Sequence, residues 1–135
     1  MAYIPNKLLG RLVGLRLYSV QFVMDYVQLR FDGELSNEVP VLNCDILPAI
    51  SRADRTYLPG EPGWADALVG LIPQVVTDSC ERTGTGIELR FSDAALRLHP
   101  TPKQIDTPEI AMLSGFDDGR WMVWRPGEDS FEDLT

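Results

Sequence analysis

The sequence predicts a mostly β fold, α+β at most, in which an antiparallel sheet is built from two similar β units with one short helix near 64–71. Three observations predict it: an internal repeat, strict alternation of apolar and polar residues in two segments, and prolines placed between the apolar segments. The chain has 135 residues, of which 44% are hydrophobic. This length and composition suit one domain that spans 1–135 and buries its own core.

The repeat begins with the string LVGL, which occurs at 12–15 and again at 68–71. Each copy is followed by a similar alternating segment, VQLRFD at 27–32 and IELRFS at 87–92. We interpret the two stretches as copies of one β unit. The repeat-like halves run from about 10–50 and 66–105, and C-terminal strands with an acidic tail occupy 106–135.

The two alternating segments are typical of strands with one buried and one wet face. The turn residues at 92–93 then predict a hairpin over 86–99. Further strands are predicted at 12–20, 39–46, 74–80, 109–114 and 120–125. Proline and glycine in 51–63 predict a long loop that divides the halves, and Pro73 is expected to end the helix.

Charge is distributed unevenly along the chain. The sequence has 20 acidic residues against 12 lysines and arginines, a net charge of -8. Residues 106–135 hold eight acids and two bases, so their net charge is -6. Nucleic acid is therefore not expected as a ligand, because phosphate contacts need clustered bases. The acidic segment is either a solvated tail or a surface that attracts a basic partner.

Candidate catalytic groups are few. His99 is the sole histidine, and Cys44 and Cys80 lack CxxC spacing and each adjoin an acid, which favours core roles over reactivity. The glycine-rich residues 83–86 lack the lysine of a phosphate loop and fit a hairpin turn. We therefore expect no catalytic residues, no metal ligands and no cofactor, and the protein is not expected to be an enzyme.

Four polar residues support an alternative. If the hairpin forms as predicted, one outer face carries Glu88, Arg90, Arg97 and His99. This set is typical of a solvated strand face. It would also suit a small-molecule-binding or enzymatic β domain with a pocket at the open end of its sheet.

The segment 121–124 is apolar on both faces, because alternation puts Trp121 and Val123 on one side and Met122 and Trp124 on the other. It is either a strand packed on both faces, or a strand that offers one face for binding. Pairing through this strand would make a homodimer.

The basic residues near the N-terminus bear on the expected cellular location of the protein. Lys7, Arg11 and Arg16 interrupt the apolar N-terminal stretch, so no membrane span is predicted, and no signal cleavage site follows. We expect a cytoplasmic protein. Ten of the 12 bases are arginine, which is typical of a GC-rich bacterial genome.

In length, acidity, repeated β character and its C-terminal segment RWMVWRPGEDSFEDL (120–134), the chain resembles the small bacterial immunity proteins encoded beside toxins. The resemblance implies that it binds and neutralises a basic toxin domain, as a monomer or a homodimer. Electrostatic steering followed by burial of aromatic side chains would drive such binding. The candidate binding residues are the acids and aromatics of this region: Asp117, Asp118, Trp124, Glu128, Asp129, Phe131, Glu132 and Asp133.

Overall fold

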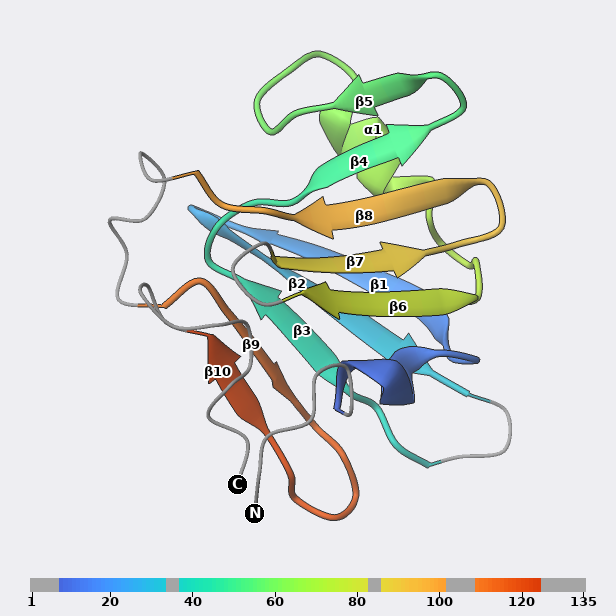
Figure 1. Ribbon diagram of the computed structural model, residues 1–135, viewed down its shortest axis with the longest axis vertical. Helices are drawn as coiled ribbons and strands as arrows, with labels where there is room; N and C mark the ends of the chain where they lie inside the picture. The colour runs from blue at the N-terminus through green and yellow to red at the C-terminus, as the bar shows by residue number, and fades with distance from the viewer. Residues whose placement is uncertain (1–7, 34–36, 83–85, 102–108, 125–135) are drawn as a thin grey trace.

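The computed structural model describes residues 8–33, 37–82, 86–101 and 109–124, and it contains two five-stranded antiparallel sheets packed face to face (Figure 1). Sheet 1 consists, in spatial order, of β1 (Arg16–Val23), β2 (Tyr26–Asp32), β3 (Val41–Cys44), β9 (Ala111–Ser114) and β10 (Met122–Trp124). Sheet 2 consists of β5 (Arg55–Tyr57), β4 (Ala49–Arg52), β8 (Ala94–Leu98), β7 (Gly86–Arg90) and β6 (Asp78–Arg82). A 3-10 helix, η1 (Leu9–Leu12), and one α-helix, α1 (Trp64–Val69), accompany them. The mostly β, antiparallel prediction is confirmed.

The strand order reveals the two similar units. In each unit a short helix (η1 or α1) precedes three strands that pair in chain order, β1-β2-β3 in sheet 1 and β6-β7-β8 in sheet 2. A hairpin then follows in each unit and joins the other unit's sheet: β4–β5 pairs with β8, and β9–β10 pairs with β3. Each sheet therefore contains strands from both halves of the chain.

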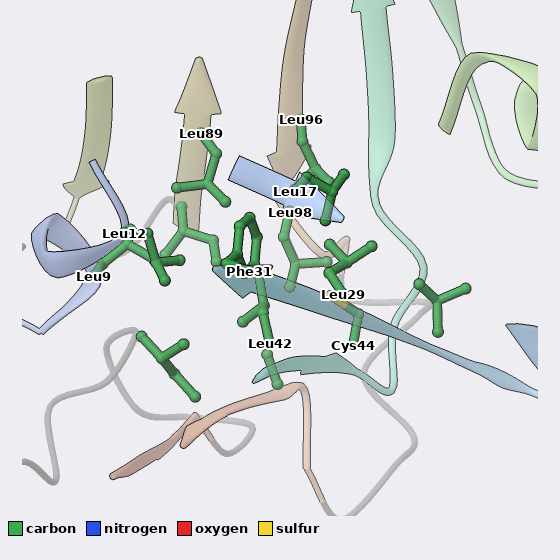
Figure 2. Packing of buried hydrophobic residues seen from close by; sticks show 14 of the residues in the cluster. Leu9, Leu12, Leu17, Leu29, Phe31, Leu42, Cys44, Leu89, Leu96 and Leu98 are labelled. Atoms are coloured by element: carbon green, nitrogen blue, oxygen red, sulfur yellow. The ribbon is translucent and has the colours of Figure 1, made fainter. Parts of the chain in front are cut away.

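The core lies between the sheets and follows from the alternation in β2 and β7. Val27, Leu29 and Phe31 of β2 are buried, while Gln28 and Arg30 on the opposite face are only half-buried. Figure 2 shows Phe31 among leucines contributed by both sheets, including Leu17 of β1 and Leu89, Leu96 and Leu98 of β7 and β8. Burial of these side chains is the main favourable term in folding.

The first LVGL string is not part of a strand, so the predicted strand 12–20 starts too early. Leu9 and Leu12 lie three residues apart and are both fully buried, which suits one face of a helical turn. Gly14 then has a φ of +91°, a conformation that interrupts an extended strand, and β1 begins only at Arg16. The second LVGL string begins in the last residues of α1, which ends at Val69. Both strings therefore lie at the end of a short helix.

Helix α1 begins where predicted. It follows Gly63, whose positive φ of +89° turns the chain into the helix, and Trp64 donates a hydrogen bond from its indole N–H to the carbonyl oxygen of Pro48 (2.8 Å). The helix ends at Val69, two residues earlier than the predicted 64–71. The hydrogen bond to Pro48 holds α1 beside the start of β4. Trp64 and Leu68 form the buried face of the helix.

The predicted loop 51–63 was wrong in its first half, because residues up to Tyr57 complete the β4–β5 hairpin. Strand β5 is short and polar, as suits the edge of sheet 2. The turn between β4 and β5 places Ala53 at a φ of +54°. The repeated units consequently extend beyond the halves expected at 10–50 and 66–105. Strand β10 is the edge of sheet 1 in the described part of the chain.

Candidate partner-binding surface and pocket

The residues predicted to form a C-terminal binding surface do not lie together. Asp117 and Asp118 are in the loop between β9 and β10, whereas Trp124 is the last residue of β10 and pairs with Ala111 at the opposite end of the hairpin. Glu128, Asp129, Phe131, Glu132 and Asp133 lie outside the described residues. The described structure therefore splits this predicted surface between two ends of sheet 1.

Trp124 does not offer an exposed ring to a partner, because it is only 5% exposed and belongs to the core cluster. Met122, Val123 and Trp124 are all buried, so in the described structure β10 is packed on both faces, one of the two alternatives that the sequence left open. Trp121, by contrast, is 55% exposed. The sequence could not show which of the two tryptophans is exposed, because alternation separates the two faces of a strand without saying which face meets the core.

Asp118 forms salt bridges within the protein. The guanidinium of Arg11 donates two hydrogen bonds to its carboxylate, at 3.1 and 2.7 Å, and Arg120 lies 3.6 Å away. Arg11 also lies over the ring of Phe116, 4.9 Å from its centroid. Two arginines therefore compensate the negative charge of Asp118, and of the predicted pair only Asp117 remains as an exposed acid without such a partner in the described structure.

We expect the carboxyl of Asp118 to titrate near pH 2. Its hydrogen bond with Arg11 and the backbone N–H of Arg120 lower its pKa to about 2. Since the folded pKa lies below that of an unfolded aspartate, the pair stabilises the fold above about pH 4, and this contribution is lost as the pH falls through about 2. Carbon-detected NMR of the carboxyl measures the midpoint. Arg11→Gln should raise it toward 3.8, and Arg16→Gln, which removes the separate pair with Asp32, should not.

Three other carboxylates gather at the opposite end of sheet 1. Asp25 lies in the β1–β2 turn, Asp45 follows β3 and Glu109 precedes β9, so three neighbouring strands bring them to one end. Burial raises the pKa of Asp45, and the negative charges of Glu109 and Asp25 raise it further, against the effect of a hydrogen bond from Asn43. Among the described residues, Asp25 and Asp45 have no basic partner.

An exposed apolar side chain lies beside these carboxylates. Met24 occupies the β1–β2 turn with its side chain fully in solvent, at a φ of +31° that a bulky residue disfavours. We call Met24, Asp25, Asp45 and Glu109 the acidic end. The acid-rich residues 126–135 follow shortly after Trp124, which closes β10 at this same end of sheet 1. Sequence reasoning missed the acidic end because its members are far apart along the chain.

The alternative pocket residues are partly brought together. Glu88 lies opposite Arg97 in the β7–β8 register, and its Oε1 is 3.4 Å from Arg97 Nε and 3.4 Å from Arg90 Nη2. Arg97 and exposed His99 line a cavity of about 470 Å³ on the outer side of sheet 2, whereas Glu88 and Arg90 do not. The other described residues that line the cavity are Ile46, Leu47, Ala49, Thr56, Leu58, Pro59, Leu98, Pro100 and Thr101.

The cysteines behave as core or sheet residues. Complete burial, followed by the charge of Asp45, raises the pKa of the Cys44 thiol to about 12, so the reactive thiolate is not formed near neutral pH. Cys80 is half-buried opposite Glu88. Within the described ranges, no group of three His, Cys, Asp or Glu side chains is arranged to hold a metal ion, and no helix has the length and apolarity to span a membrane.

The fold and these surfaces define a two-sheet antiparallel β domain made of two interlocked units. Comparison with protein-family models, with curated proteins and with solved structures finds no match to this chain.

Proposed function

We propose that the protein is a non-catalytic binding protein of the immunity or inhibitor type, which acts in the cytoplasm and neutralises a basic toxin domain. The acidic end supports this proposal most directly. Burial raises the pKa of Asp45, and the charges of Glu109 and Asp25 lie close enough to raise it further, beside a methionine that projects fully into solvent. A partner that supplies lysine or arginine would relieve the repulsion, and Met24 would be buried against it.

The charge distribution of the chain agrees with this surface. The sequence has a net charge of -8, and the residues that continue from β10 add four acids between Glu128 and Asp133. A net charge of one sign accelerates encounter with a partner of opposite charge. The proposed interface therefore comprises the acidic end together with the sequence that follows Trp124.

The test is a comparison of three baits in a pull-down from the organism that encodes the chain. The wild type should retain a basic protein at low salt and release it at about 0.5 M salt, where screening shortens electrostatic interactions to a few Å. The double variant Asp25→Lys/Glu109→Lys should lose that protein. Asp54→Lys/Asp93→Lys changes net charge equally at exposed turns of sheet 2, and it should retain the protein.

Once the partner is purified, reversal of the tail acids should slow association. We expect Glu128, Asp129, Glu132 and Asp133, all changed to Lys, to reduce the association rate about 3- to 10-fold at low salt, with the difference closing at high salt. Surface plasmon resonance at several salt concentrations measures the rates. An unchanged association rate would show that the tail is not part of the interface. An equal decrease of the rate in the Asp54→Lys/Asp93→Lys variant would show that the effect comes from net charge alone.

A further inference from the structure

The cavity on the outer side of sheet 2 is built by the place where the chain crosses between the sheets. Residues 45–48 connect β3 of sheet 1 to β4 of sheet 2, so Ile46 and Leu47 stand at one end of the cavity. Ala49 lies opposite Arg97 in the β4–β8 register, and its small side chain leaves space over the sheet. Thr56 and Leu58 on the other side come from β5 and its continuation.

The charge of the described cavity lining is opposite to that of the protein. Among the described residues, the lining contains Arg97 and His99 and no aspartate or glutamate, in a chain whose net charge is -8. The only acid in contact with Arg97 in the described structure is Glu88, which lies 3.4 Å from Nε and shares its charge with Arg90. The two terminal nitrogens of the Arg97 guanidinium therefore remain available as donors, and the side chain is 42% exposed.

The remaining lining is largely apolar. Leu58 is 52% exposed, although it lies beside buried Ile46 and Leu98. A volume of about 470 Å³ falls in the range of small-molecule sites, which commonly combine an apolar wall with a few placed polar groups. An arginine over such a wall suits a ligand that carries an anionic group at one end and an apolar body at the other.

We propose that this pocket binds a small organic carboxylate with an apolar body. The Arg97 guanidinium pairs with the carboxylate through its terminal nitrogens, and a ring N–H of His99 is a further donor at the same end of the pocket. The apolar body lies over Ala49 and against Leu58 and Leu47. The described pocket lining contains no member of the acidic end, and the inference does not depend on the proposed inhibitor function.

The test uses 2-naphthoate as the probe, with its neutral amide 2-naphthamide and inorganic phosphate as comparisons. Titration of the full chain, followed by backbone amide NMR, should show 2-naphthoate shifting resonances of Ala49, Leu58 and His99. Naphthamide and phosphate should each bind at least about 10-fold more weakly, because naphthamide lacks the negative charge and phosphate lacks the apolar body. Equal binding of acid and amide, equal binding of phosphate, or no binding of 2-naphthoate would overturn the proposal.

Arg97→Gln should weaken 2-naphthoate binding about 10- to 100-fold, as expected for loss of a charge-assisted hydrogen bond. Arg90→Gln is the matched control, since Arg90 contacts the same Glu88 oxygen at the same distance but lies outside the pocket. It should bind 2-naphthoate as the wild type does. Equal loss in both variants would show a long-range charge effect and overturn the assignment. Unaltered sheet resonances in each variant verify folding.

Discussion

Replacing Phe31 with alanine should lower the free energy of unfolding by about 3–5 kcal/mol, the usual cost of removing a buried aromatic ring. Phe31 is fully buried in β2 and lies opposite Leu17, with leucines of both sheets around it (Figure 2). The surrounding side chains come from strands fixed by sheet hydrogen bonds, so they cannot close the cavity completely. Since small domains are stable by about 5–15 kcal/mol, this is a large fraction of the total.

Urea denaturation measures this loss, and Phe22→Ala provides the matched control. Phe22 is on the neighbouring strand β1, but it is 49% exposed and makes one edge-on contact with Trp64, with ring centroids 6.0 Å apart. Its loss should cost about 1 kcal/mol. Similar losses for the two variants would contradict the position of the core between the sheets.

Gly86→Ala should destabilise the protein by about 3 kcal/mol or more, because two effects act at once. Gly86 has a φ of +142°, which an L side chain rarely adopts. A Cβ there would also meet the backbone carbonyl oxygen of Leu98 on the adjacent strand β8 well inside van der Waals distance, and it would press on the ring of His99. The β7–β8 pairing would have to shift to make room.

Gly14→Ala separates these two effects. Gly14 also has a positive φ, +91°, but a Cβ there would have no atom within 4 Å. It should therefore cost only the backbone strain, about 1–2 kcal/mol. Denaturant unfolding gives both values, and hydrogen exchange of the β7 amides should accelerate in Gly86→Ala alone. Equal effects would show that conformation, and not close approach of the strands, determines the need for glycine at 86.

The extent to which the fold was predictable depends on how locally each element is specified. The β7–β8 hairpin was predicted correctly because alternation and turn residues both lie within 86–99. Strand β5 was missed because Arg55–Tyr57 is short, polar and edge-placed, and it therefore carries no apolar pattern. The start of β1 was misplaced because a short apolar string such as LVGL at 12–15 is consistent with either a strand or a helix.

The candidate surfaces were less predictable, for a physical reason. Asp25 and Asp45 become neighbours through the β2–β3 pairing, but Glu109 joins them only because the β9–β10 hairpin pairs with the other unit's sheet, and nothing local in the sequence encodes that exchange. Arg97 and His99 were chosen from one outer strand face, which was sufficient to place them together. Their apolar counterparts at Leu47 and Leu58 come from a crossing and an edge strand that periodicity does not reveal.

The exchange of hairpins also determines when each sheet can be completed on the ribosome. Val41 of β3 pairs with Ser114 of β9, 73 residues later in the chain. At a synthesis rate of about 5–20 residues per second, that edge of β3 has no native neighbour for about 4 to 15 s. Strand β4 likewise has one unpaired edge until β8, its partner in sheet 2, has been synthesised. Unpaired strand edges are templates for aggregation, so the nascent chain is most vulnerable until its last strands emerge.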